Sequence, residues 1–229
     1  MKAVILQSNY IPWKGYFHLI HEADVFIFYD EVKYTKNDWR NRNKIYTPNG
    51  MQWLSIPIES TAVKLKINKV DIISQRWQEH HYKSLYYGYK RAPFFSQLEK
   101  ILKEVYIESR WNNLSELNQH LIKKISSLIG IQTKFLDSEN FNLEGNRVER
   151  LINLLKDAGA SEYISGPSAK EYLSGSENLF SEVGIQLTYM QYPSYPVYPQ
   201  LYEPFRHDVS IYDLVANIKL EEINRYIWG

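Results

Sequence analysis

The chain has 229 residues, of which 44% are hydrophobic and 23% are charged, and its formal net charge is +1. This near-neutral balance argues against a general nucleic-acid-binding protein, which would carry a broad basic surface. No cysteine occurs and no apolar stretch approaches the roughly 18 residues that cross a bilayer, so disulfides, cysteine-based zinc sites and a membrane span are excluded. We therefore expect a soluble, cytoplasmic protein.

The chain begins with a pattern of strand, loop and helix. Residues 3–6 form a short apolar run that is typical of a buried strand, and helical periodicity resumes only after Pro12. In an open α/β sheet, such a loop lies at the carboxyl edge where ligands bind, and the free N–H groups of the next helix favour an anion. We therefore expect a site for an anionic small molecule here. Its candidate contacts are Gln7, Asn9, Tyr10 and Trp13.

A second apolar run, residues 25–29, ends in Asp30 and Glu31 and predicts a parallel strand that brings carboxylates to the same edge. Residues 33–44 then hold five cations against one carboxylate, a local charge of five minus one, or +4. Arginine can grip phosphate or carboxylate through two bonds, and tryptophan offers a flat face for a base or sugar. The alternative is a solvated basic loop with one buried tryptophan. The binding candidates are Lys36, Asp38, Trp39, Arg40, Arg42 and Asn43, and Asp30 is a candidate base.

The middle of the chain predicts a hairpin followed by helices. Asn49–Gly50 separates two strand-like runs and is a strong hairpin signal. Residues 63–67 alternate apolar side chains with lysine, which predicts a further half-exposed strand and a mixed sheet. Three helical patterns follow without an intervening strand. We therefore expect one α/β domain, residues 1–229, with residues 75–130 as a helical subdomain or insertion.

An alternation of strands and helices then returns. Residues 133–136, 162–164 and 185–190 have strand character, and Asn146 and Gly159 mark the start and end of a helix. This order predicts a mostly parallel, Rossmann-like central sheet with an antiparallel hairpin. Residues 192–205 place prolines among aromatic rings, which indicates an ordered, extended segment. Two short helices are expected to close the chain.

Two further features could carry chemistry. His81 lies on an otherwise aromatic helical stripe and is a candidate general base, although a buried structural histidine is the commoner outcome. The SGPSAK loop resembles a small anion-binding turn, with Ser165 and Lys170 as candidate contacts, but it lacks the spacing of a P-loop. No GxGxxG motif supports a dinucleotide cofactor. His18 and His21 match a zinc-binding pair incompletely, so no metal is predicted.

Several of these motifs together resemble the WbqC-like family of bacterial proteins. They are QSNYIPWKGYF, the strand end at Asp30, YTKNDWRNRNKI, WLSIPI, the His81 helix ending in YKRAPFF, SGPSAKEYL and SIYDL, and they extend over nearly the whole chain. Ser8 stands where the family usually has proline. The resemblance implies a cytoplasmic protein associated with O-antigen or other cell-surface polysaccharide biosynthesis, without implying a particular reaction. The residues carried over by motif position include Gly15, Asn41, Gly166 and Asp213 besides those named above.

These observations give three hypotheses. The first is a transferase of nucleotide-sugar or glycan-precursor metabolism that N-acylates or otherwise modifies an amino sugar, with an acyl-CoA as a candidate donor. Arg40 and Arg42 would hold a diphosphate or carboxylate, and Asp30 or His81 would take the proton from an attacking amine. The second is a non-catalytic protein of the same pathway that binds a sugar nucleotide or another enzyme, motivated by the tyrosine and proline segment. The third, by analogy alone, is a nucleotidylyltransferase-like enzyme.

Overall fold

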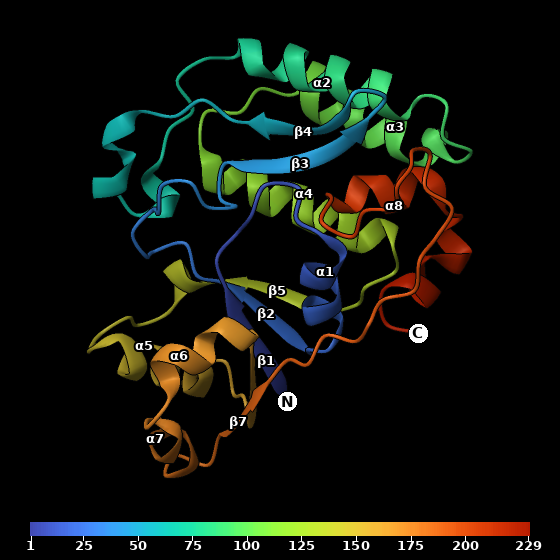
Figure 1. The fold of residues 1–229 in the computed structure, drawn as a ribbon. Coiled ribbons are helices and arrows are strands. Elements are labelled where there is room, and N and C mark those ends of the chain that lie inside the picture. The colour runs from blue at the N-terminus through green and yellow to red at the C-terminus, as the bar shows by residue number, and fades with distance from the viewer.

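A computed structural model describes residues 1–229 and centres on a five-stranded sheet (Figure 1). The strands lie in the order β5 (Lys134–Asp137), β2 (Val25–Phe28), β1 (Lys2–Leu6), β6 (Glu162–Ser165) and β7 (Gln186–Tyr189). Every neighbouring pair is parallel; Ile5, for example, pairs with Ile27. The predicted α/β fold with a parallel, Rossmann-like sheet is confirmed.

The strand order creates a topological switch point between β1 and β6. From β1 the chain proceeds to β2 and β5 on one side, and it then crosses over to β6 and β7 on the other side. All five strands end at the same edge, and a crevice opens where adjacent strands send their connections in opposite directions. The loops that follow Leu6 and Ser165 therefore flank the expected ligand position.

The predicted hairpin is present, but it is not part of the central sheet. Strands β3 (Arg42–Thr47) and β4 (Gly50–Ser55) pair only with each other, and Thr47 lies opposite Gly50 across a two-residue turn. Gly50 has φ of +95°, a conformation that costs little for glycine alone. The expectation of a mixed central sheet is therefore wrong, because the antiparallel strands form a second sheet.

The strand predicted at residues 63–67 is also wrong. This stretch runs from the end of one 3₁₀ helix, η1 (Ser60–Lys64), through Leu65 and Lys66 to the start of another, η2 (Ile67–Lys69). The alternation of apolar residues does not reflect burial on one face, because Val63 and Leu65 are 41% and 42% exposed while Ile67 is buried. Without a row of buried side chains, alternation alone does not specify a strand.

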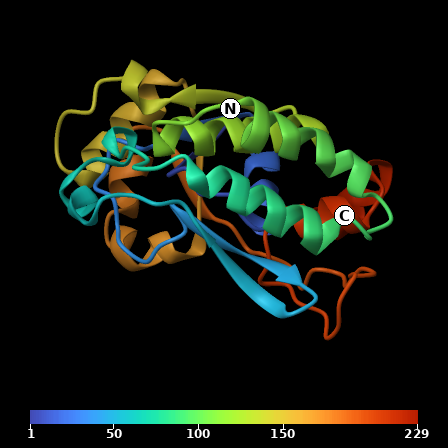
Figure 2. The ribbon, with the colours of Figure 1, turned by 90° about the horizontal axis from the view of Figure 1, so that it is seen from above.

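Three helices lie beside the hairpin, as Figure 2 shows. They are α2 (Arg76–Tyr89), α3 (Phe95–Lys103), which continues into the π-helical turn η3 (Glu104–Glu108), and α4 (Leu114–Leu128). Asn113 caps α4 as predicted, because its side chain accepts hydrogen bonds from the N–H groups of Ser115 and Glu116.

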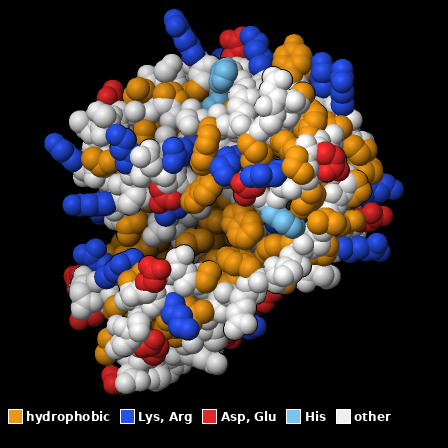
Figure 3. Space-filling model, viewed as in Figure 1, with side chains coloured by type: hydrophobic (Ala, Val, Ile, Leu, Met, Phe, Trp, Pro, Cys, Tyr) orange, Lys and Arg blue, Asp and Glu red, His pale blue; other side chains and the backbone are white.

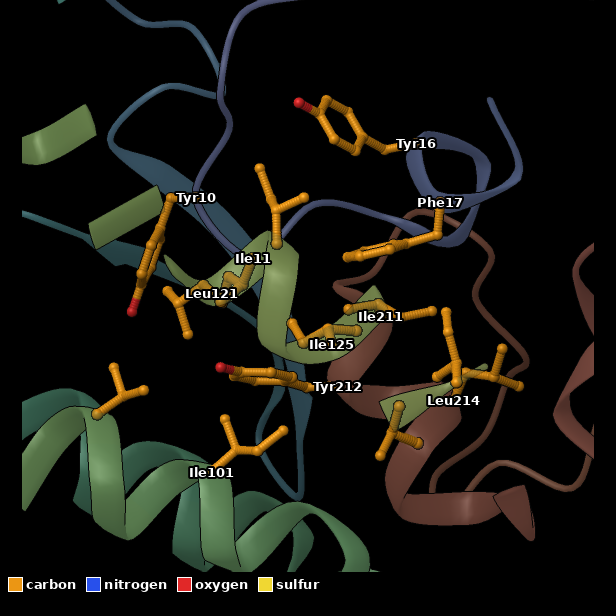
Figure 4. Packing of buried hydrophobic residues seen from close by; sticks show 14 of the residues in the cluster. Tyr10, Ile11, Tyr16, Phe17, Ile101, Leu121, Ile125, Ile211, Tyr212 and Leu214 are labelled. Carbon is orange, nitrogen blue, oxygen red and sulfur yellow. The ribbon is translucent and has the colours of Figure 1, made fainter. Parts of the chain in front are cut away.

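Apolar side chains bury both faces of the sheet. One cluster of 46 buried residues joins the first face to α1 (Lys14–His21), the three helices and α8 (Ile211–Asn217), so these elements share one core. Figure 4 shows Ile11, Leu121 and Tyr212 within this cluster. On the second face, a separate cluster packs α5 (Arg147–Asp157), α6 (Lys170–Leu173) and α7 (Glu177–Ser181) against the strands. Burial on both faces is characteristic of a parallel sheet.

The rest of the chain consists of short turns and one long extended segment. The turns are η4 (Ser138–Asn140), η5 (Pro167–Ala169) and η6 (Leu220–Tyr226). Residues 190–209 have neither helix nor strand and run past α1 on their way to α8 (Figure 1). The predicted extended course fits residues 192–200, whereas residues 201–204 bend. The Tyr195 hydroxyl group lies 2.9 Å from Nδ1 of His18 on α1. None of the helices has the length and apolar character needed to span a bilayer.

Candidate functional site

A cavity of about 1040 Å³ lies at the carboxyl edge of the sheet, beside the switch point. Its walls come from the loops after β1, β2 and β6 and from the first turn of α5. Figure 3 shows a hollow on this face, where hydrophobic side chains lie between charged ones. Predicted site residues in its lining are Gln7, Asn9, Trp13, Asp38, Trp39, Arg40 and Ser165. The structure thus brings half of the predicted set together around one cavity.

Arg40 connects two walls of this cavity. Its guanidinium group donates hydrogen bonds to Oδ1 of Asn9 and, over 3.1 Å, to Oε1 of Gln7. The same group lies 3.5 Å from the carboxylate of Asp38, and only 14% of the Arg40 side chain is exposed. Arg40 therefore fixes the loop after β1 against the segment that follows β2.

Asp38 is the acidic side chain in the cavity lining. Burial acts to raise its pKa, but the charge of Arg40 and hydrogen bonds from the Thr35 hydroxyl and Trp39 N–H outweigh that effect. The pKa of Asp38 is consequently lowered from its ordinary value. Asp38 is therefore ionised at neutral pH and can accept hydrogen bonds from a ligand.

Aromatic rings form the remaining surfaces of the cavity. Trp13 packs edge-on against Tyr192 with ring centroids 5.3 Å apart, and both residues line the cavity. Trp39 stacks on Trp53 at 5.6 Å, although the two residues are 43% and 44% exposed. Exposed, stacked indole rings beside a cavity are suited to contact with a sugar or base.

Asp30 lies outside the cavity lining, at the end of β2. It is almost fully buried and accepts hydrogen bonds from the Ser8 N–H, at 2.8 Å, and from the Ser115 hydroxyl group. Burial raises the pKa of Asp30, and these hydrogen bonds only partly oppose that effect. Ser8 stands between Gln7 and Asn9, which line the cavity, so Asp30 holds the loop after β1 on the side away from the cavity. A proline at position 8 would have no N–H to donate.

Tyr10 and His81 form a buried pair in the core rather than part of the cavity lining. The Tyr10 hydroxyl group lies 2.7 Å from Nδ1 of His81 and 2.7 Å from the hydroxyl group of Tyr106. Burial lowers the pKa of His81 to about 3, with a further contribution from His80, so its imidazole is neutral at physiological pH. In this position His81 supports the loop that carries Tyr10.

Asn43 supports the same loop. It is buried, and its side-chain amide donates hydrogen bonds to the carbonyl groups of Tyr10 and Ile11. Ile11 has φ of +37°, an unusual value for a β-branched residue. The amide of Asn43 therefore holds a backbone conformation that would otherwise be unfavourable.

Three predicted contacts are cationic residues outside the cavity lining. Lys36 is exposed, and Lys170 is exposed at the start of α6. Arg42 lies with its guanidinium group 4.6 Å from the ring centre of Trp53 and donates to the Asn37 carbonyl group. None of these three side chains lines the cavity.

Other residues that line the cavity were not among the sequence-based candidates. Arg147 and Arg150 project from the first turn of α5, and Tyr29 and Tyr172 contribute rings. The sequence did contain a signal, since arginines stand one and four positions after the cap residue Asn146. No group of three or more histidine, cysteine or acidic side chains is arranged to hold a metal ion.

The fold and the cavity define an α/β protein with a cavity at the switch point of its parallel sheet. A family model described as the WbqC-like protein family matches residues 7–225, and the chain belongs to this family. A Mycobacterium tuberculosis protein named "Uncharacterized protein Rv1507c" is 42% identical over 221 residues, which cover 96% of this chain and 95% of that protein. No solved structure matches the chain.

Proposed function

We propose that this protein is a transferase that acts on a nucleotide-linked sugar during the synthesis of O-antigen or another cell-surface polysaccharide in the cytoplasm. The observation that carries the proposal is the cavity of about 1040 Å³ at the switch point, with guanidinium groups and aromatic rings in its walls. A sugar nucleotide requires cations for its phosphates and flat surfaces for its base and sugar. Membership of the WbqC-like family supports the pathway through the resemblance described above.

The proposed reaction is transfer of an acyl group to an amino sugar. The amine nitrogen attacks the carbonyl carbon of a thioester donor such as an acyl-CoA, the new C–N bond forms, and the C–S bond breaks. The thiolate leaves with the bonding electron pair and takes up the proton that the amine loses. Asp38 orients the amine by accepting its hydrogen bond, because this carboxylate lines the cavity and is ionised at neutral pH.

A second candidate function is a non-catalytic protein that binds the same class of ligand. One observation favours it. Asp30 and His81, the two groups expected to act as a base, both lie in buried hydrogen-bond networks outside the cavity lining. A protein that only binds a sugar nucleotide needs no base in its cavity.

Binding and transfer can be measured separately. Titration calorimetry with UDP-, dTDP- and GDP-linked sugars tests binding, and mass spectrometry of amino-sugar forms incubated with acetyl-CoA tests transfer. We expect Asp38→Asn to retain sugar-nucleotide binding and to lose transfer by about 100-fold or more. Asp71→Asn, at an exposed acid outside the cavity, is the matched control. Binding without transfer in the wild-type protein would favour the second candidate, and no binding of any sugar nucleotide would reject both.

A further inference from the structure

Two arginines in the first turn of α5 form a cationic surface in the cavity. Arg147 and Arg150 are three positions apart, so their side chains lie on the same face of the helix. The guanidinium carbon of Arg147 lies 3.4 Å from the ring centre of Tyr172, and Nε of Arg150 donates to the Gly145 carbonyl group over 2.9 Å. Both side chains are therefore held in place by neutral partners.

No carboxylate balances these two charges. Neither Arg147 nor Arg150 takes part in any of the ion pairs of the molecule, whereas Arg40 is paired with Asp38. Two like charges three positions apart on one helix face repel each other, and an anion with several oxygen atoms would remove that repulsion. Lys33 also lines the cavity and takes part in none of these ion pairs, so α5 holds two of the three unbalanced cations in the lining.

Arg40 is less available to a phosphate group. Its two terminal nitrogens already donate to Asn9 and Gln7, and its Nε is buried without a partner. The backbone N–H groups at the N-terminus of α5 do not bind the anion either, because those of Val148 and Glu149 already donate to the Asn146 side chain. Recognition of an anion at α5 thus depends on the two guanidinium groups.

The loop after β6 leaves room beside these arginines. Ser165, Gly166 and Ser168 line the cavity together with Arg147 and Arg150. A Cβ atom added to Gly166 would meet no heavy atom within 4 Å, so this stretch of backbone borders open space. Figure 1 shows α5 and α6 on one side of the strand ends and the β3–β4 hairpin, which follows Arg40, on the other.

We propose that Arg147 and Arg150 bind the diphosphate of the nucleotide-linked sugar and that the sugar extends from there towards Arg40 and Asp38. This inference rests on the function proposed above. It divides the cavity into a diphosphate subsite at α5 and a sugar subsite at the loop after β1. The amine to be modified then lies next to Asp38, which is the carboxylate that orients it.

The experiment compares Arg147→Ala/Arg150→Ala with Arg40→Ala, using inorganic pyrophosphate, UDP and UDP-linked N-acetylglucosamine as calorimetric probes. We expect the double variant to bind pyrophosphate and UDP about tenfold or more weakly than the wild type, a loss of roughly 1.4 kcal/mol or more, because it lacks the charged hydrogen bonds to the phosphate oxygens. We expect Arg40→Ala to weaken binding of UDP-linked N-acetylglucosamine more than it weakens binding of pyrophosphate or UDP, because Arg40 lies at the sugar subsite. Lys156→Ala/Arg225→Ala removes two exposed charges outside the cavity and is the matched control.

Each result has a defined meaning once circular dichroism shows that the variants are folded. Unchanged pyrophosphate and UDP affinity in the double variant overturns the diphosphate subsite, and so does an equal loss in the charge-matched control. If UDP-linked N-acetylglucosamine still binds and the corresponding amino-sugar nucleotide is acylated in that case, the proposed function stands without this subsite. If pyrophosphate binding depends on Arg147 and Arg150 but no sugar nucleotide binds, the subsite stands and the proposed function fails.

Discussion

The Tyr10 hydroxyl group lies 2.7 Å from Nδ1 of His81, and both side chains are buried. This hydrogen bond joins the loop after β1 to helix α2, across 71 positions of sequence. Tyr106 extends the contact to the turn after α3. The loop after β1 is therefore anchored in the core at Tyr10, while Gln7 and Asn9, which precede Tyr10, line the cavity. Rigid support of this kind fixes the geometry of a binding site.

We expect His81→Gln to change how stability depends on pH. Burial lowers the pKa of His81 from 6.5 to about 3, so the unfolded chain binds a proton that the folded protein rejects. The stability that neutral His81 provides is present above pH 6.5 and is lost as the pH falls towards 3. Between pH 7 and pH 4.5 the wild type should lose about 2–3 kcal/mol more than the variant, measured by urea unfolding. His80→Gln, at the exposed neighbour, should keep most of the wild-type pH dependence, because burial is the larger cause of the lowered pKa of His81.

Substitution of Gly15 should disturb the cavity through Trp13. A Cβ atom at Gly15 would lie 2.3 Å from the Trp13 ring, so the rigid indole has to move away from Tyr192. We expect Gly15→Ala to lower stability by about 1–3 kcal/mol, to alter tryptophan fluorescence and to weaken ligand binding. Gly88→Ala is the control, because its Cβ would meet the nearest atom at 3.5 Å. An equally stable Gly15→Ala protein would contradict the close packing.

Local signals in the sequence predicted most of the fold. Asn113 and Asn146 specify helix starts through contacts with the next three residues, and the turn before Gly50 specifies the hairpin in the same way. The strand predicted at residues 63–67 does not form, because Val63 and Leu65 are exposed. Periodicity alone does not show whether the apolar side chains of a segment are buried. Local information was sufficient wherever the stabilising contacts are close in sequence.

The site was less predictable because its partners are distant in sequence. The predicted loop residues Gln7, Asn9 and Arg40 do meet at the cavity, since β1 and β2 are adjacent parallel strands. Arg147 and Arg150 reach the same cavity only because α5 crosses from β5 to β6. A basic pair on a helix looks like a solvated surface until the topology is known.

A pH effect of opposite sign is expected from Asp213. This carboxyl group is fully buried, its Oδ1 accepts hydrogen bonds from Tyr198 and Gln200, and burial raises its pKa from 3.8 to about 6. The folded protein therefore holds a proton that the unfolded chain loses, so stability is present below pH 3.8 and declines as the pH rises through 6.

Asp213→Asn should remove this decline, because the amide keeps an oxygen acceptor and never ionises. Relative to the variant, the wild type should lose on the order of 2–3 kcal/mol of unfolding free energy between pH 4 and pH 7. Urea unfolding at both pH values measures the difference. Asp157→Asn, at an exposed acid near the end of α5, is the control. Parallel stability curves for wild type and Asp213→Asn would show that the carboxyl group does not titrate in this range.

Arg40→Ala distinguishes an arginine that supports the loop from one that acts only on ligand. The Arg40 side chain is 14% exposed and bonded to Asn9 and Gln7, so its removal leaves two amide oxygens and Asp38 without their partner. We expect the unliganded protein to lose about 1–3 kcal/mol, measured by urea unfolding. Arg42→Ala, which removes a rim side chain stacked on Trp53, should cost less than about 1 kcal/mol. If both variants are as stable as the wild type while Arg40→Ala alone abolishes sugar-nucleotide binding, Arg40 contacts the ligand directly and the loop is held by Asp30 and Asn43.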